Sequence, residues 1–179
     1  RVHLATAFSD WLDETRQERG THRDLVLVST AGGGIRAAYW TATVLGELQK
    51  IEHFENVLFA ISGVSGGSVG ASVYRALLAD GVPRETLQQK AQVVLSHDFL
   101  GPVTTALLYP DLTQRFLPNL DLMDRGKALE QAWEVAYSDE MESARFGNSF
   151  RQLYSDSRPW PALFLNATRV ETGRRSVAS

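Results

Sequence analysis

Residues 57–78 have the sequence VLFAISGVSGGSVGASVYRALL. The apolar run at 57–61 predicts a buried strand, and the pattern at 68–78 predicts an amphipathic helix. Between them, Ser65 lies in a Gly-x-Ser-x-Gly pattern, whose small residues allow a serine to occupy a tight corner between strand and helix. This stretch predicts an α/β fold with Ser65 as a nucleophile at a helix N-terminus, where free amides and the helix dipole favour negative charge.

A second unit of the same kind precedes the first along the chain. Residues 24–28 predict a strand, residues 37–50 predict a helix, and three consecutive glycines lie between them. The buried side of this helix is expected to carry Ala38, Trp40, Ala42, Leu45 and Leu48. Because open α/β sheets place their sites at the carboxyl ends of parallel strands, both glycine turns are expected at one edge of the sheet.

The first glycine turn is expected to supply the hydrogen-bond donors that acyl transfer needs in addition to a nucleophile. The tetrahedral intermediate carries a negative oxygen that hydrogen-bond donors must meet. Consecutive glycines let backbone amides point into a cavity without obstruction by side chains. We therefore predict an oxyanion hole in the turn Gly32, Gly33 and Gly34, with the amide of Gly66 as a further donor.

The same turn also fits a different class of site. Residues 32–37 satisfy the dinucleotide-binding pattern Gly-x-Gly-x-x-Gly/Ala, which would make the chain an oxidoreductase domain. That site needs an acidic residue about twenty positions on, at the end of the second strand, but Glu52 and Glu55 both precede the strand. This alternative leaves Ser65 without a role. A P-loop is excluded, because neither glycine cluster is followed by Lys-Ser or Lys-Thr.

Two motifs resemble those of the patatin-like phospholipases, which are related to the cytosolic phospholipases. They are TAGGGIRA at 30–37 and GVSGGS at 63–68. Residues 124–126 and 166–173 also look like segments of this family, so the resemblance covers residues 24–179. It implies a three-layer α/β/α sandwich with a mostly parallel sheet.

The resemblance implies a serine-dependent lipid acyl hydrolase, of phospholipase or lysophospholipase type, with a Ser-Asp dyad and no metal or organic cofactor. Ser65 would be its nucleophile. Arg36 would stabilise the oxyanion loop or meet a substrate phosphate. The alternative is that Arg36 is solvated, although a positive charge gains nothing from the dipole in the first turn of a helix.

The aspartate of the dyad is missing from the sequence. In the family it lies in an Asp-Gly-Gly or Asp-Gly-Ala motif beyond the segment that resembles residues 166–173. Asp80-Gly81 is the only Asp-Gly pair here, and it lies before that segment. We expect a domain truncated on its C-terminal side and inactive by itself, because a serine without a base is a weak nucleophile. A catalytically silent lipid-binding or scaffold domain of the same fold is the alternative.

A Ser-His-Asp triad would activate Ser65 in another way. In α/β-hydrolases its members follow the order Ser, Asp or Glu, His. His97 is the only histidine after Ser65, and Asp80 and Glu85 precede it within one short helical region. Residues so close together are a poor source of separately positioned triad members, so His97 is expected either on a helix surface or with its hydrogen bonds satisfied by a structural partner. His3, His22 and His53 have no sequence neighbours that suggest a metal site.

Composition agrees with one globular domain and excludes several functions. The chain has 179 residues, 44% of them hydrophobic, and no cysteine, which excludes disulfides, Cys-zinc sites and thiol catalysis. A net charge of −3 gives no global attraction to nucleic acid or to anionic membranes. No apolar run is long enough to span a membrane. We expect a phospholipid or other acyl lipid as substrate, peripheral membrane contact, no nucleic acid, and a cytoplasmic or membrane-associated location. The oligomeric state is not indicated.

Three other segments have expected roles. Residues 1–23 should form an N-terminal helical segment that docks on the domain through Leu4, Ala7, Phe8, Trp11 and Leu12. Asp124 should be a helix N-cap, and Asn166 should make hydrogen bonds directed at the backbone. Prolines at 102, 110 and 118 should break the helical potential of residues 100–122 and leave a lid-like excursion. Its apolar residues would line an acyl-chain pocket, touch a lipid surface or pack against the sheet.

Overall fold

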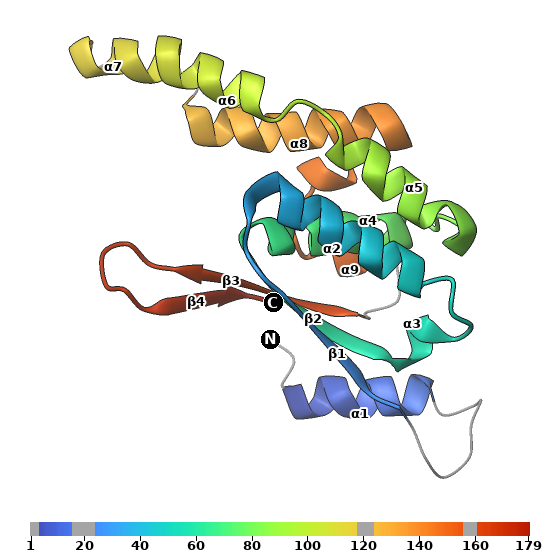
Figure 1. The fold of residues 1–179 in the computed structure, drawn as a ribbon. Coiled ribbons are helices and arrows are strands. Elements are labelled where there is room, and N and C mark those ends of the chain that lie inside the picture. Colours follow the sequence, from blue (N-terminus) through green and yellow to red (C-terminus); the bar gives the residue numbers. More distant parts are fainter. Residues whose placement is uncertain (1–3, 16–23, 118–123, 156–160) are drawn as a thin grey trace.

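A computed structural model describes residues 4–15, 24–117, 124–155 and 161–179. The fold is α/β, with a four-stranded sheet in the order β1-β2-β3-β4 (Figure 1). The strands are β1 (Val26–Thr30), β2 (Leu58–Val64), β3 (Ala162–Thr168) and β4 (Arg175–Ala178). The first three strands run parallel, and β4 returns antiparallel beside β3. The α/β class predicted from the sequence is confirmed, and the sheet is mixed.

Helix α4 lies directly on one face of this sheet, and α2 and α5 lie on the same side, packed against α4 and against each other (Figure 1). The helical segments are α1 (Leu4–Glu14), α2 (Gly34–Leu48), α3 (Phe54–Val57), α4 (Gly66–Ala79), α5 (Arg84–Leu95), α6 (Leu100–Ala106), η1 (Leu107–Asp111), α7 (Leu112–Phe116), α8 (Arg125–Met141), η2 (Arg145–Gly147) and α9 (Gln152–Ser155). As predicted, α2 follows β1 and α4 follows β2. Helix α2 begins three residues earlier than predicted and α4 begins two residues earlier, because the last glycines of each turn already belong to the helix.

The main core lies between the sheet and these three helices. Its fully buried side chains include Leu45, Leu58, Ile61, Tyr74, Leu77, Leu87 and Leu163. Helix α4 is buried on most of its sides, because the sheet, α2 and α5 surround it. The hydroxyl group of Tyr74 is satisfied in this core, since it donates to Gln49 Oε1 at 2.7 Å. The paired turns at the ends of β1 and β2 are thus held on a rigid base.

The prediction that Trp40 faces the core is wrong. Trp40 is 69% exposed. The buried stripe of α2 consists of Ala38, Thr41, Ala42, Leu45 and Gly46. Small residues lie there because α2 approaches α5 closely: a Cβ on Gly46 would lie 2.6 Å from the Cα of Gln88. An indole ring would not fit into that contact.

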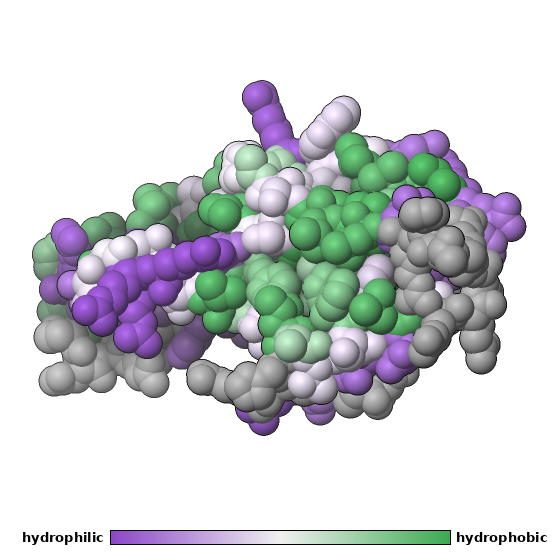
Figure 2. Space-filling model, turned by 90° about the horizontal axis from the view of Figure 1, so that it is seen from below, coloured by the Kyte–Doolittle hydropathy of each residue, from purple (hydrophilic) through white to green (hydrophobic). Residues whose placement is uncertain are grey.

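Helix α1 lies on the opposite face of the sheet (Figure 1). Its anchor is the buried Trp11, whose ring centroid lies 5.7 Å from that of Phe8 and 5.4 Å from that of Phe59 in β2. The helix covers only part of this face, and apolar side chains remain visible there from below (Figure 2). Val26 and Val28 of β1 pack on the main core, whereas Leu27 between them stays exposed.

Replacement of Trp11 by alanine should strongly destabilise the protein. Truncation of a buried Trp typically costs about 3–5 kcal/mol of unfolding free energy, because transfer and cavity terms add. Urea unfolding followed by circular dichroism measures this loss. Leu4→Ala is the matched control on the exposed side of α1, and it should change the unfolding free energy by no more than about 0.5 kcal/mol. Equal losses for the two variants would contradict the packing described for α1.

Residues 100–116 form a nearly continuous helical arm, made of α6, the π-helical turn η1 and α7. The prediction that prolines break this segment is wrong. Pro102 lies in the first turn of α6, where its missing N–H has no helical partner to lose. Pro110 lies inside the π-helical turn, where the regular i to i−4 bonding is already changed. Pro118 lies outside the described residues.

The arm packs on α8 and not on the sheet (Figure 1), so the expectation that its apolar residues pack against the sheet is also wrong. Asp124 caps α8 as predicted: its carboxylate accepts a hydrogen bond from the Lys127 amide at 2.9 Å. This bond holds the pKa of Asp124 below its usual value. Among the helices that the structure describes, none combines the length and the apolar character that a membrane crossing requires.

Candidate active site

Ser65 forms the corner between β2 and α4. Its φ of 52° and ψ of −125° lie in a backbone region that is nearly restricted to glycine. Such a conformation costs about 1–3 kcal/mol and persists only where the surrounding structure enforces it. Strained corners of this kind occur most often at functional sites, and here the strained residue carries a hydroxyl group.

The two glycine turns pack against each other, backbone to backbone. A Cβ on Gly66 would overlap the carbonyl oxygen of Gly34, and one on Gly67 would lie 2.6 Å from the carbonyl oxygen of Ala31. A Cβ on Gly32 would lie 3.3 Å from the Cβ of Ser65 and 3.8 Å from its Oγ. The turn after β1 therefore lies directly beside the Ser65 side chain.

Two helices begin at this contact. The first amides of a helix have no partner within the helix, and the N-cap residues Gly33 of α2 and Ser65 of α4 make no side-chain capping bond. Gly33 and Gly34 adopt φ values of 150° and 59°, which favour glycine over other residues. Two uncapped helix N-termini side by side would stabilise an anion next to Ser65.

A cavity of about 430 Å³ opens at Ser65. One wall consists of α4, through Ser65, Ser68, Val69 and Ser72. The other walls come from α8, η2 and the β3–β4 hairpin, and their lining residues are Trp133, Phe146, Leu165, Asn166, Ala167, Ser176 and Ala178. The cavity is mostly apolar, with hydroxyl groups along one helix, which suits a ligand that combines an apolar part with a polar group.

Asn166 holds the strand end that leads into the Ser65 corner. Its Nδ2 donates to the carbonyl oxygen of Gly63 at 3.0 Å and to the Ser62 hydroxyl at 3.0 Å. Its Oδ1 accepts from Arg175 Nε at 2.9 Å and also from Arg175 Nη2. The predicted backbone-directed role of Asn166 is confirmed, and Arg175 fixes the amide so that it can fill this role.

Asn166→Ala should therefore weaken the fold around the corner. The substitution leaves a strand carbonyl and a guanidinium without their partner, and each such loss costs about 1–3 kcal/mol. Thermal and urea unfolding would measure the effect. Asn148→Ala, at an exposed position, is the matched control and should be close to neutral. If the two variants had the same stability, Asn166 would have no clamping role.

The other residues considered from the sequence lie away from the cavity. Arg36 is exposed and does not line it. Asp80 lies at the far end of α4, about 20 Å away by the rise of the helix, and accepts from the Tyr137 hydroxyl at 2.7 Å and from Arg145 Nε at 2.5 Å. Burial and this bond raise the pKa of Tyr137 above its usual range. Asp80 is thus part of a structural network.

His97 is bound to Glu140, with Nε2 and Oε1 3.0 Å apart. His97 lies just after the end of α5 and is partly buried, so the pairing confirms a satisfied histidine and not one on a helix surface. Both residues lie outside the Ser65 cavity. Among the described residues that line this cavity there is no Asp, Glu or His. A group that accepts the Ser65 proton is therefore not among them.

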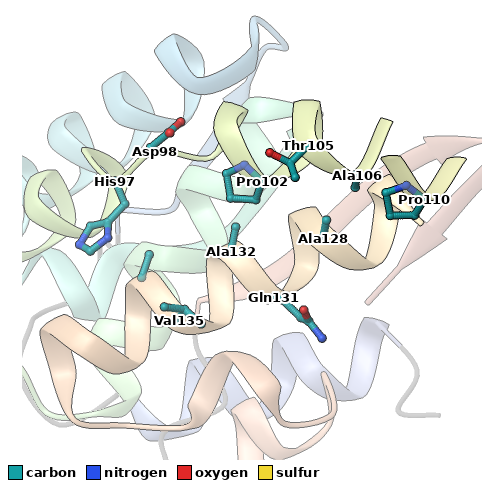
Figure 3. Close-up of a pocket in the computed structure, with 11 residues that line it drawn as sticks. His97, Asp98, Pro102, Thr105, Ala106, Pro110, Ala128, Gln131, Ala132 and Val135 are labelled. Atoms are coloured by element: carbon teal, nitrogen blue, oxygen red, sulfur yellow. The ribbon is translucent and has the colours of Figure 1, made fainter. Parts of the chain in front are cut away.

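A second cavity, of about 530 Å³, lies between the arm and α8. Pro102, Thr105 and Ala106 of α6 line one side, and Ala128 and Ala132 of α8 line the other (Figure 3). It shares no lining residue with the Ser65 cavity. The arm therefore does not supply a wall of the candidate active site.

Trp133, Phe146 and the serines after Ser65 were missed as site residues. Ser65, Ser68 and Ser72 recur at intervals of three and four, which is a signal for one helix face. Trp133 and Phe146 carry no local signal, because tertiary packing alone brings them to the cavity.

Across residues 4–15, 24–117, 124–155 and 161–179, no three His, Cys, Asp or Glu side chains are grouped as a metal site requires. No protein-family model, no curated protein and no solved structure matches the chain.

Proposed function

We propose that this domain is a serine-dependent lipid acyl hydrolase, of phospholipase or lysophospholipase type, on a patatin-like three-layer fold in which α1 belongs to the third layer. One observation carries the proposal: Ser65 lies on a strained corner, beside two uncapped helix N-termini, in the wall of a mostly apolar cavity. This arrangement combines a nucleophile, donors for an oxyanion and space for an acyl chain.

The proposed reaction proceeds in two steps. Ser65 Oγ attacks the ester carbonyl carbon and gives its proton to a base, and the amides of Gly33, Gly34 and Gly66 meet the negative oxygen. The bond from carbon to the leaving alcohol oxygen breaks, and this oxygen takes up the proton. Water then attacks the acyl-enzyme, releases the fatty acid and restores the Ser65 hydroxyl.

The resemblance to patatin-like phospholipases assigns the base to an aspartate in an Asp-Gly-Gly or Asp-Gly-Ala motif. In a longer protein that carries this domain, the motif would follow Ser179.

Two alternative functions can be distinguished from the proposed one by particular residues. A silent lipid-binding domain is favoured by the lack of a carboxylate among the described residues that line the cavity. A dinucleotide site is disfavoured by Glu55, which lies in α3 before β2 and pairs with Arg84 at 3.1 Å. Glu55 is thus at the opposite end of β2 from the glycine turn, where it cannot bind a ribose.

The test is to incubate the full-length natural protein with phosphatidylcholine in water enriched in heavy oxygen. Hydrolysis should release a fatty acid with one heavy oxygen in its carboxylate, because water resolves the acyl-enzyme. Lipid binding without release would support the silent domain. Saturable binding of a nicotinamide dinucleotide without release of fatty acid would support the oxidoreductase.

A further inference from the structure

Helix α2 carries large side chains on the face that points away from the core. Arg36, Trp40, Thr43 and Glu47 follow one another at intervals of four, three and four residues, which places them on one line along the helix. This line lies opposite the buried stripe of α2. Arg36, Trp40 and Glu47 are exposed. In Figure 1, α2 lies at the front of the view, and none of the other described elements covers it.

The composition of this outer face is that of a protein interface. Tryptophan is one of the more deeply buried residues on average, yet most of Trp40 is exposed. Tyr39 and Ile35 are exposed beside it. Trp, Tyr and Arg are the residues most enriched where protein interfaces gain most of their binding energy. The outer face of α2 combines all three, with aromatic residues at its centre and charged residues at its two ends.

The exposed residues of α2 are also arranged symmetrically about one point of the helix axis. Trp40 and Thr43 lie at equal distances on either side of this point, and so do Arg36 and Glu47. In a contact about a two-fold axis, the same patch serves on both copies, and each residue meets a different residue of the other copy. If two α2 helices packed antiparallel about that point, Arg36 of each copy would meet Glu47 of the other.

We propose that the outer face of α2 is the interface of a homodimer, in which the α2 helices of two copies pack antiparallel. We call it the α2 face and define it as Arg36, Tyr39, Trp40, Thr43 and Glu47. Packed helices lie about 8–10 Å apart, so long side chains such as arginine and glutamate reach across the contact. Antiparallel packing also brings the positive end of each helix dipole to the negative end of the other.

A second copy fits the charges of this face better than a different partner does. Arg36 makes no ion pair with any other described residue, so it can bind an acidic group of a partner. Glu47 pairs with Lys50 at 2.5 Å, but such an exposed pair contributes little, and a carboxylate accepts further hydrogen bonds. The α2 face thus supplies both members of the ion pair that its own antiparallel packing requires.

The α2 face is separate from the candidate active site. It begins two residues after Gly34 of the glycine turn, and none of its residues lines the Ser65 cavity. Dimerisation through this face therefore requires neither acyl transfer nor a lipid, and it does not rest on the proposed function. Ser65→Ala should dimerise as the unmodified protein does.

Sedimentation velocity of the full-length natural protein tests the proposal. A dimer should form as the concentration rises over a range of about 100-fold. Trp40→Ser should weaken the dimer at least about tenfold, because a central aromatic residue of the interface is lost. Phe116→Ser is the matched control, because Phe116 is an aromatic residue of the arm that is 78% exposed. This control should dimerise as the unmodified protein does.

Charge reversal tests the antiparallel arrangement. Arg36→Glu and Glu47→Arg should each weaken the dimer about tenfold or more, because like charges would meet at both ends of the interface. An equimolar mixture of the two variants should associate as the unmodified protein does, because each reversed charge then meets its opposite in the other chain. Arg151→Glu, at an exposed position outside α2, is the control and should have no effect.

Three results would overturn the proposal. The first is a monomer at every concentration. The second is a dimer that Phe116→Ser weakens as much as Trp40→Ser does, which would place the contact elsewhere. The third is a mixture of Arg36→Glu and Glu47→Arg that associates no better than either variant alone, which would exclude antiparallel pairing. Circular dichroism should show unchanged folding in every variant, since all of the substituted side chains are exposed.

Discussion

Ser65→Ala is expected to lower the rate of ester hydrolysis by the full-length protein at least about 10⁴-fold. The loss should be this large because the serine oxygen forms the bond to the acyl group, and donors in the glycine turn cannot replace a nucleophile. The fall should appear in kcat, with substrate binding largely retained, because the rest of the cavity is unchanged. Release of fatty acid from a short-chain ester and from a phospholipid would measure it.

The control for this prediction is another serine of the same cavity. Ser72 lines the wall two turns further along α4, and Ser72→Ala removes the same hydroxyl group without touching the strained corner. It should change the rate by less than about tenfold. Activity that survives Ser65→Ala but not Ser72→Ala would contradict the assignment of the nucleophile.

Gly66→Ala is expected to have the second largest effect, although it adds only one methyl group. That methyl would overlap the carbonyl oxygen of Gly34, so the two turns would have to separate. Overpacking of this kind costs about 1–3 kcal/mol of stability. Displacement of the oxyanion donors by about 1 Å costs about 100-fold in rate. The loss of rate should exceed what the loss of folded protein explains.

Gly81→Ala provides the comparison for this variant. Gly81 adopts a φ of 68°, and a Cβ there would meet nothing within 4 Å. Its replacement costs about 1–2 kcal/mol through backbone strain but leaves the contact between the turns intact. Urea unfolding and the hydrolysis assay should therefore separate the two variants. Equal rates for both would show that close packing of the turns is unimportant for function.

The strand, corner and helix at residues 57–78 could be predicted because their signals are local. An apolar run, a tight pattern of small residues and a helical period follow one another without interruption. Asp124 and Asn166 were assigned correctly for the same reason, since short polar side chains bond to the backbone nearby. These predictions required no knowledge of distant parts of the chain.

The errors arose where packing overrides local preference. Trp40 was placed in the core on its hydrophobicity, but a stripe of small residues on α2 was needed to approach α5. Local preference predicts that Pro110 breaks a helix, but a π-helical turn accommodates it. Trp133 and Phe146 reach the cavity from α8 and η2, and no pattern within their own segments indicates this.

The most direct test of the account is to label the full-length protein with a fluorophosphonate probe and to map the modified peptide. We predict a single adduct on Ser65, formed at a rate that falls to background in Ser65→Ala and remains nearly unchanged in Ser72→Ala. Such a result would mean that the strained corner holds an activated nucleophile. No adduct on a folded, full-length protein, or an adduct at another residue, would contradict the proposed hydrolase.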